Sequence, residues 1–234
     1  AELASERSPI LILPARDPQA LRLVSDTGTL GVFLPYTALH LLLFRHAACR
    51  AAYALVMTSA NLKGQPMVTA PEQARGKLSG IADLFLDHDR RILFRADDSV
   101  LRPCARSARG PSFCQIRRSR GYVPGLITLP RPLEGSVLAV GGDLKNAPAL
   151  GSGRDLHLGA YVGDLEDPET EQDFREQIGR LLELYALHPQ RVVCDPHPLY
   201  VSGAWARGSG LGPVLTVQHH HAHVLSVMAE HGLE

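Results

Sequence analysis

Residues 192–200 read Val-Val-Cys-Asp-Pro-His-Pro-Leu-Tyr, and this stretch indicates the fold class. Its three apolar residues predict a short buried strand, which ends in Asp195 and His197. The preceding segment, residues 170–187, carries apolar side chains at helical spacing and predicts a core-facing helix. A helix that leads into a buried strand favours an α/β fold. Asp and His at a strand end are typical of a catalytic or ligand site, although a proline-rich turn with satisfied polar side chains would look the same.

Four histidines follow the next predicted strand, residues 214–217. Residues 218–223 read Gln-His-His-His-Ala-His, and the residues after them can continue as a helix. Helical residues four apart share a face, so His219 and His223 can direct ring nitrogens at one metal ion, zinc or iron(II). The zincin motif has Glu where His220 stands, so a zincin hydrolase is not predicted. A solvated helix end and a cloning tag are the alternatives.

The composition bounds the class of protein. The 234 residues include 24 basic and 24 acidic side chains, so the formal net charge is zero. Zero net charge argues against a nucleic-acid or membrane partner, and no apolar run approaches the length that crosses a bilayer. The four cysteines form no Cys-x-x-Cys pair, and the start of the chain has neither an initiator Met nor an apolar signal core. We therefore expect a cytoplasmic protein whose first residue is a cut end.

A candidate ligand loop follows a predicted strand in the first half of the chain. Residues 54–57 are apolar and lead into Thr58, Ser59 and Asn61, with Gly and Pro soon after. Proteins of the α/β class place ligand loops in this way. Thr69 lies three residues before a Glu, which is capping-box spacing and predicts the start of a helix. The other elements expected here are strands at residues 8–13 and 29–34 and a helix at residues 36–50.

Two charged segments are candidate functional sites. The acidic pair at 97–98 is flanked by Arg90, Arg95 and Arg102, and a surface salt-bridge cluster is the simplest account of such a run. Its place beside short apolar runs favours a functional role. Residues 117–124 read Arg-Arg-Ser-Arg-Gly-Tyr-Val-Pro. Because Arg makes bidentate contacts with phosphate, this segment is either a nucleotide or phosphate site or a plain basic linker.

A predicted hairpin follows a linker in the middle of the chain. Residues 125–135 contain Gly and Pro and one acid, so we place a domain boundary there. Residues 137–140 predict a strand, and residues 141–146, Gly-Gly-Asp-Leu-Lys-Asn, read as a hairpin turn. Turn glycines with a Lys can bind phosphate, although this is not a Walker A sequence.

The order of these motifs resembles that of the HypF carbamoyltransferases. Residues 58–61 and 64–66 resemble the substrate loop of YrdC-like domains, and residues 88–100 resemble a later part of that domain. The order is more specific than any single motif, and it covers nearly the whole chain. The segments that follow in the same order are residues 117–124, 142–146, 163–165, 195–200 and 219–223.

The resemblance implies an α/β chain with two domains. Residues 1–124 are then a twisted-sheet YrdC-like domain without its N-terminal part, 125–135 a linker, and 136–234 the first part of an actin-like ATPase (ASKHA) domain. In this family an acylphosphatase domain and zinc fingers come earlier, and an Asp metal ligand and Gly-rich nucleotide loops come later. We therefore expect an internal fragment that does not complete the reaction alone.

The resemblance also implies an enzyme, a carbamoyltransferase of nickel-iron hydrogenase maturation. HypF-like proteins use carbamoyl phosphate and ATP to form carbamoyl adenylate. They pass the carbamoyl group to the C-terminal Cys of the partner protein HypE, where it becomes a cyanide ligand of the hydrogenase. The implied cofactors are ATP, Mg²⁺ and either Fe²⁺ or Zn²⁺.

The resemblance and the chemistry together assign residues to three roles. The expected metal ligands are His219 and His223. The residues expected to act in catalysis, by orienting the acyl group or holding phosphate, are Ser59, Asn61, Arg95 and Lys145. The residues expected to bind nucleotide or phosphate are Thr58, Ser59, Asn61, Arg90, Arg95, Ser99, Arg118, Arg120, Asp143 and Lys145.

Three other functions stay open. An O-carbamoyltransferase of secondary metabolism has both domains, but in the reverse order. A non-catalytic RNA-binding YrdC-like module is the second, and the zero net charge argues against it. The third is a metal-binding scaffold without catalysis.

Overall fold

The computed structural model describes residues 1–49, 51–104 and 112–233. The chain divides into two compact units: unit 1 comprises residues 1–59 and 97–122, and unit 2 comprises residues 60–96 and 123–234. These limits differ from the predicted domain limits, which stay a prediction. No helix in the described ranges is both long enough and apolar enough to span a bilayer.

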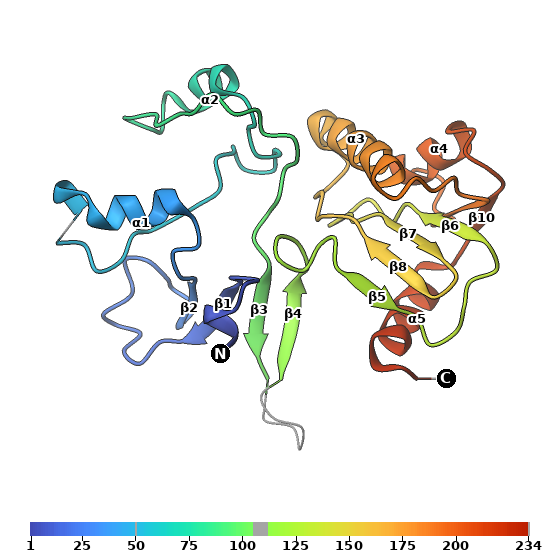
Figure 1. Cartoon of the computed structure of the whole chain (residues 1–234), viewed down its shortest axis with the longest axis horizontal. Coiled ribbons are helices and arrows are strands. Elements are labelled where there is room, and N and C mark those ends of the chain that lie inside the picture. Colours follow the sequence, from blue (N-terminus) through green and yellow to red (C-terminus); the bar gives the residue numbers. More distant parts are fainter. Residues whose placement is uncertain (50, 105–111, 234) are drawn as a thin grey trace. The chain divides into compact units, whose positions relative to one another are not determined.

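Unit 1 is built on a mixed four-stranded sheet with the strand order β2-β1-β3-β4 (Figure 1). The strands are β1 (Ile10–Pro14), β2 (Thr29–Val32), β3 (Val100–Pro103) and β4 (Phe113–Arg117). β1 runs antiparallel to β2 and parallel to β3, and β3 is antiparallel to β4. Three short helices accompany the sheet: η1 (Glu2–Ala4), α1 (Ala38–Arg45) and η2 (Ala47–Cys49). Leu11 and Leu101, which pair across β1 and β3, and Pro9 are the buried apolar side chains of the described part of this unit.

Two predictions for unit 1 need correction. Residues 54–57 form no strand, and no described strand pairs with them. Their side chains are largely exposed, 78% for Val56 and 47% for Met57. A strand needs a neighbouring edge to take its backbone hydrogen bonds, and apolar composition alone does not supply one. The helix expected over 36–50 is shorter: α1 begins after the cap Thr37 and ends at Arg45, and Arg50 lies outside the described residues.

Unit 2 contains a six-stranded sheet with the order β10-β9-β6-β7-β8-β5. The strands are β5 (Leu126–Thr128), β6 (Ser136–Ala139), β7 (Ala149–Ser152), β8 (Asp155–Leu158), β9 (Arg191–Cys194) and β10 (Val214–Thr216). β6, β7 and β8 form an antiparallel meander, and β5 adds to it at β8. β9 runs parallel to β6, and β10 runs parallel to β9. The predicted hairpin and the predicted strands near 192–194 and 214–217 are therefore confirmed.

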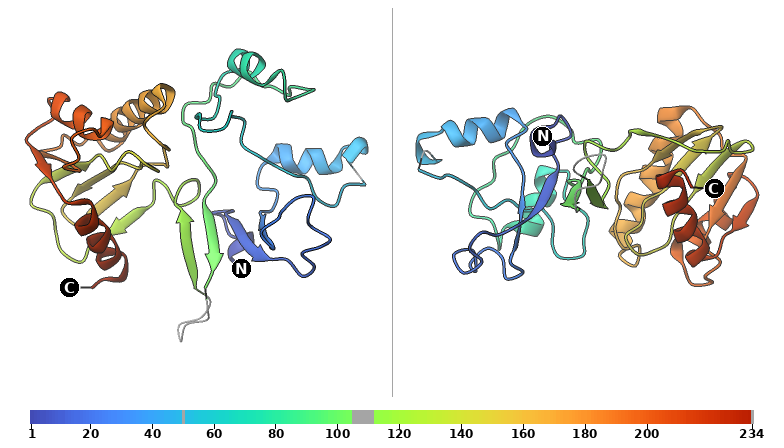
Figure 2. Two further views of the ribbon diagram at one scale, coloured as in Figure 1. Left: turned by 180° about the vertical axis from the view of Figure 1, so that it is seen from behind. Right: turned by 90° about the horizontal axis from the view of Figure 1, so that it is seen from below.

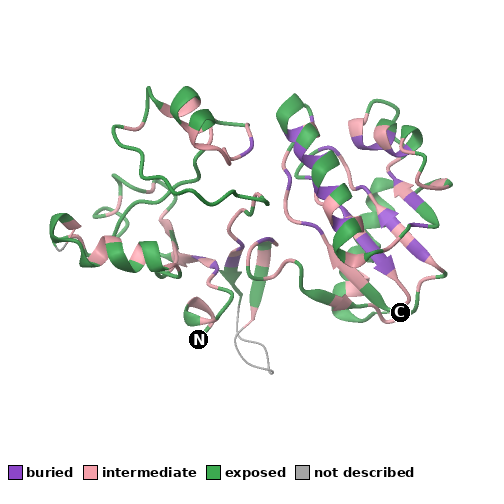
Figure 3. Ribbon diagram, turned by 45° about the horizontal axis from the view of Figure 1, so that its top comes forward, coloured by how far each residue is buried: buried purple, intermediate pink, exposed green. Residues whose placement is uncertain are grey.

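Unit 2 contains four helices in its described part. They are α2 (Pro71–Leu78), α3 (Pro168–Tyr185), α4 (Val201–Gly208) and α5 (His219–His231). Three of them, α3, α4 and α5, lie against this sheet (Figure 1). α3 and α4 cover one face, and α5 lies on the opposite face (Figure 2). The buried residues gather in the sheet and on the inner side of α3 (Figure 3). The core comprises Leu138, Val140, Leu150, Val162, Leu165, Phe174, Ile178, Leu181, Val192, Cys194 and Ala206.

The ends of α3 and α2 follow from local chemistry. Asp167 caps α3 by accepting hydrogen bonds from the backbone N–H groups of Glu169 and Thr170, and the helix begins at a proline. The helix predicted over 170–187 is thus confirmed, with a shift toward the N-terminus. The predicted Thr69 cap of α2 is wrong, because Ala70 is the N-cap and makes no side-chain cap bond. Pro71, with its fixed φ, starts this helix instead.

Candidate functional site

Three loops of unit 2 meet at one edge of its sheet. β6, β9 and β10 are mutually parallel neighbours, so their carboxyl ends lie at the same edge. β6 leads into residues 141–146, β9 into residues 195–200, and β10 into α5. Ligand sites of open α/β sheets form at this kind of edge. The predicted polar segments of the second half of the chain are therefore brought together here.

The pair His219 and His223 forms the first turn of α5 at this edge. Their Nε2 atoms are 3.1 Å apart, and the two rings meet edge to face with centroids 4.7 Å apart. The Nδ1 atom of His219 lies 2.7 Å from Oδ2 of Asp195, the residue that follows β9. Asp195, which follows β9, therefore contacts His219, and His219 contacts His223 in the same helix.

The spacing of the two histidine nitrogens fits a shared metal ion. Two nitrogens that each lie about 2.1 Å from one ion are about 3.0–3.4 Å apart in ordinary geometries, and 3.1 Å falls inside that range. In the described ranges no group of three or more His, Cys, Asp and Glu residues is arranged to hold a metal. Burial raises the pKa of the neighbouring Cys194 thiol, which argues against a thiolate ligand. The described residues thus supply a two-nitrogen site.

The loop after β6 is held in one conformation by its own side chains. The amide nitrogen of Asn146 donates to the carbonyls of Val140 (2.8 Å) and Gly142 (2.6 Å). Lys145 adopts a left-handed backbone (φ 51°), and its N–H donates to Oδ1 of Asp164 at 2.7 Å. The Lys145 side chain is exposed at this loop. The exposed ammonium group is accessible to a phosphate, and its role in phosphate binding stays a prediction.

Asp143, another predicted phosphate-site residue, is buried and caps α4. Its carboxylate accepts hydrogen bonds from the N–H of Val201 (2.7 Å) and from the N–H and hydroxyl of Ser202 (3.0 and 2.7 Å). Both of its oxygens are used within the protein, so the structure gives it a positioning task. It ties the loop after β6 to the helix after β9.

The candidate ligand loop folds around Asn61. The side-chain amide nitrogen of Asn61 donates to the carbonyls of Leu62 (3.1 Å) and Gln65 (2.8 Å). Thr58 and Ser59, which belong to unit 1, are both exposed. Arg90 is exposed as well and belongs, like Asn61, to unit 2.

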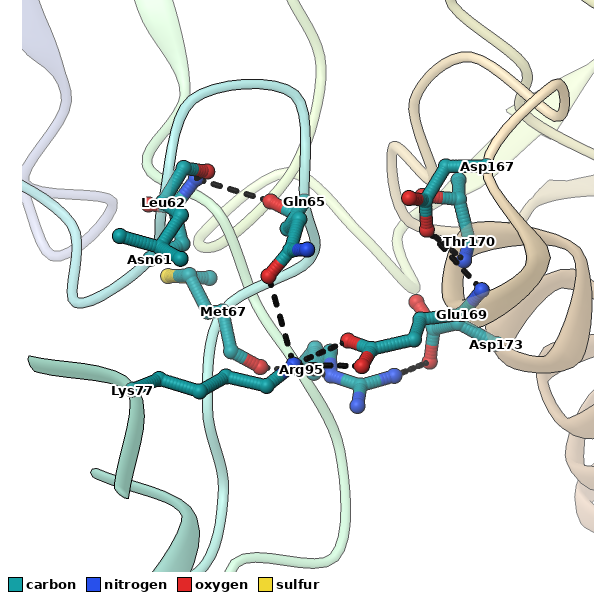
Figure 4. A network of polar contacts seen from close by, with 10 residues as sticks. All are labelled: Asn61, Leu62, Gln65, Met67, Lys77, Arg95, Asp167, Glu169, Thr170 and Asp173. Atoms are coloured by element: carbon teal, nitrogen blue, oxygen red, sulfur yellow. Dashed lines mark hydrogen bonds and ion pairs between the residues drawn. The ribbon is translucent and has the colours of Figure 1, made fainter. Parts of the chain in front are cut away.

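Arg95 is fixed by two partners within unit 2 (Figure 4). Its Nε atom donates to the carbonyl of Met67 at 2.8 Å, and its Nη1 atom lies 2.7 Å from Oδ1 of Asp173 in α3. The Asp173 side chain is 3% exposed. Beside this pair, Lys77 of α2 contacts Glu169 of α3 at 2.5 Å. Two ion pairs thus connect residues 60–96 with α3.

Sequence reasoning missed Asp173, Lys77 and Glu169 as partners. A signal for Asp173 was available in the chain, because Thr170, Asp173 and Gln177 recur at helical spacing beside the apolar side chains of α3. All three are buried. A polar stripe on the buried side of a helix indicates a partner that compensates it. The partner of Asp173 is Arg95, which lies 78 positions earlier in the chain. Sequence spacing does not predict a contact over such a separation.

Ser99 and Arg120, two of the predicted site residues of unit 1, contact one another. The Ser99 hydroxyl, which is fully buried, donates to the carbonyl of Arg120 (2.9 Å) and accepts from the N–H of Ser119 (2.8 Å). The Arg120 guanidinium binds Asp98 at 2.6 Å and stacks over Tyr36, 3.7 Å from the ring centroid. These contacts hold the segment after β4 in place. A contact of either residue with nucleotide stays a prediction.

Arg118 is also engaged within unit 1. Its Nη2 atom donates to the carbonyl of Tyr122 at 3.0 Å, and Nη1 lies 3.5 Å from the side-chain oxygen of Gln115. Arg117 in turn lies 3.2 Å from Oδ1 of Asp97, so all three arginines of residues 117–120 have partners within unit 1. This arrangement gives no support to nucleic-acid binding.

Two family models match the chain in succession. Residues 3–118 match the family described as telomere recombination, which groups Sua5, YciO and YrdC, and residues 132–230 match the HypF Kae1-like domain. The predicted α/β class, with a YrdC-like domain before an actin-like ATPase domain, is confirmed.

Proteins of known family are similar along nearly the whole chain. Carbamoyltransferase HypF of Synechocystis is 40% identical over 99% of this chain and 29% of that protein. HypF2 of Cupriavidus necator is 42% identical over 98% of this chain and 30% of that protein. A crystal structure of full-length HypF in the phosphate- and nucleotide-bound form is 37% identical, with a TM-score of 0.86, and covers 100% of this chain and 36% of its own.

The chain therefore spans about 30% of the length of the curated relatives that it matches. Residues 58–66 lie within the first of the two matched ranges, and His219 and His223 lie within the second. On this ground the chain belongs to the HypF carbamoyltransferase family.

Proposed function

We propose that this chain forms part of a HypF-type carbamoyltransferase, with the acyl-activation loop and two ligands of a metal site. The observation that carries the proposal is similarity along 98–99% of the chain to proteins named as carbamoyltransferases. A related structure is described as phosphate- and nucleotide-bound, which supports a nucleotide substrate here. The proposal extends to the longer protein of which such a span is a part.

The proposed reaction uses carbamoyl phosphate and ATP. Hydrolysis of carbamoyl phosphate releases inorganic phosphate and leaves carbamate. A carbamate oxygen then attacks the α-phosphorus of ATP, which forms carbamoyl adenylate and releases pyrophosphate. The thiolate of the C-terminal Cys of HypE attacks the carbamoyl carbon and displaces AMP. Positioning and electrostatics are what a protein contributes to such a step. A cytoplasmic location is part of the proposal, and the four cysteines of this chain, all free thiols, are compatible with a reducing compartment.

Two side chains of unit 2 are suited to the activation step. Arg95 uses Nε and Nη1 for the Met67 carbonyl and for Asp173, which leaves Nη2 as the nitrogen for a ligand phosphate. Asn61 is held by the carbonyls of its own loop. Both side chains are therefore fixed before a ligand arrives, and preorganised donors stabilise developing charge better than mobile ones.

The metal part of the proposal rests on the His219 and His223 nitrogens. They fit a shared Zn²⁺ or Fe²⁺ ion by their separation. A divalent ion held there supplies Lewis-acid polarisation of a carbonyl or phosphoryl oxygen. Mg²⁺ accompanies ATP in the proposal. The exposed Lys145 side chain at the same sheet edge is the proposed phosphate contact of this site.

Carbamoyl-phosphate-dependent exchange of pyrophosphate into ATP tests the proposal on the protein as it occurs in the cell. Asn61→Ala should lower exchange by roughly a hundredfold, as expected for loss of a preorganised polar contact. Gln172→Ala is the control, because it removes an amide from an exposed position of α3 and should leave exchange unchanged. Exchange that Asn61→Ala does not alter would refute the site. RNA binding by a wild-type protein without exchange would favour the RNA-binding function.

A further inference from the structure

We propose that Asp195 is a positioning residue for His219: it fixes the ring so that its Nε2 atom is the metal-binding nitrogen. This inference rests on the proposed metal site. It adds Asp195 to the two histidines that the sequence predicts as metal ligands. The two carboxylate oxygens of Asp195 contact the backbone N–H of His197 and the Nδ1 atom of His219.

Asp195 is itself fixed before it meets His219. It follows directly after β9, and its Oδ1 atom accepts the backbone N–H of His197 at 3.0 Å, which closes a turn of the chain. Its side chain is 9% exposed, whereas that of His219 is 55% exposed. The carboxylate is therefore the rigid member of the pair, and the imidazole is the member that needs an orienting contact.

The second oxygen of Asp195 selects one tautomer of His219. Oδ2 lies 2.7 Å from Nδ1, so a neutral ring carries its hydrogen on Nδ1 and keeps a lone pair on Nε2. A metal binds that lone pair, and a carboxylate behind a ligating histidine makes the ring a better ligand. Without Asp195 the ring is free to carry its hydrogen on Nε2, which blocks the metal.

The direction of the ring completes the argument. With Nδ1 held by Asp195, Nε2 of His219 lies 3.1 Å from Nε2 of His223. Two lone pairs at this distance repel each other unless a hydrogen or a cation lies between them. Gly142 lies beside the ring: a Cβ there would stand 3.5 Å from Cε1 of His219. Asp195 thus orients the His219 ring through Nδ1, and Gly142, which has no side chain, lies beside the ring near Cε1.

Zn²⁺ affinity provides the first test, measured by competition with a chromophoric chelator on the protein as it occurs in the cell. Asp195→Asn keeps the size of the side chain and removes its charge, and it should weaken Zn²⁺ binding by about 10- to 100-fold. Asp155→Asn makes the same change at the exposed first residue of β8 and should leave affinity unchanged. Equal affinity in wild type and Asp195→Asn, or equal weakening by both variants, would overturn the proposal.

The tautomer of His219 provides the second test, and it needs no metal and no variant. Nitrogen chemical shifts of the metal-free wild-type protein should show the hydrogen on Nδ1 of His219. A hydrogen on Nε2 would overturn the proposal even if Asp195→Asn failed to fold. Wild-type protein that binds no Zn²⁺ would instead remove the metal part of the proposed function, and the tautomer would still decide whether Asp195 orients the ring.

Discussion

The carboxylate of Asp173 is buried, and it forms an ion pair with Arg95. Among the residues that the structure describes, replacing Arg95 by Ala leaves this carboxylate with the Gln177 amide as its side-chain partner. Because a buried charge without a counter-ion is costly, Arg95→Ala should lower the free energy of unfolding by about 1–3 kcal/mol. Denaturant unfolding followed by circular dichroism measures it.

The matched control is Arg175→Ala in the same helix. Arg175 pairs with Glu171 one turn away, and the two side chains are 47% and 31% exposed, so the loss should be about 0.3–0.5 kcal/mol. Equal losses in the two variants would show that the Asp173 contact is no stronger than a surface ion pair.

Single residues also show where sequence reasoning stops. The approach of His219 to His223 was predictable, because helical geometry alone brings residues four apart together. The contacts of Asp195 with His219 and of Arg95 with Asp173 span 24 and 78 positions, so they depend on the folded chain. Arg120 was predicted from charge as a phosphate ligand, and its charge is matched by Asp98 within unit 1.

At the scale of elements, α3 offers a test at its C-terminal end. Ala186 follows the helix in the left-handed region, at φ 48° and ψ 37°, where a side chain is strained. Ala186→Gly relieves that strain and should raise the free energy of unfolding by about 0.5–1 kcal/mol. Thermal or denaturant unfolding checks the change. Ala204→Gly, the same substitution inside α4, should act in the opposite direction by about 1 kcal/mol. Loss of stability in both variants would contradict the argument.

Elements with buried neighbours were predictable, and elements without them were not. The strands near 137–140 and 192–194 pair along both edges in the sheet of unit 2, so their apolar sequence and their structure agree. Residues 54–57 have the same kind of sequence, but no described strand pairs with them. Strand formation depends on such partners as much as on composition.

At the scale of the whole molecule, burial is unequal between the units. Unit 2 contains the eleven-residue core, whereas Pro9, Leu11 and Leu101 are the buried apolar side chains in the described part of unit 1. Local opening costs less where less apolar surface is covered. Backbone amides of β1 and β3 should therefore exchange with deuterium on the order of a hundredfold faster than those of β6 and β9. Mass spectrometry of peptic fragments measures this, and uniform protection across both units would be inconsistent with the burial.

The fixed conformation of the loop between β6 and β7 should affect the rates at which a ligand binds and leaves. Asn146 binds two carbonyls of this loop, and Asp143 fastens it to the start of α4. Its conformational entropy is therefore lost during folding and not during ligand capture. An anion that meets these backbone amides should bind at a rate set by diffusion and charge, with no slow rearrangement to follow. Release, governed by the strength of the contacts, would then determine how long the ligand stays.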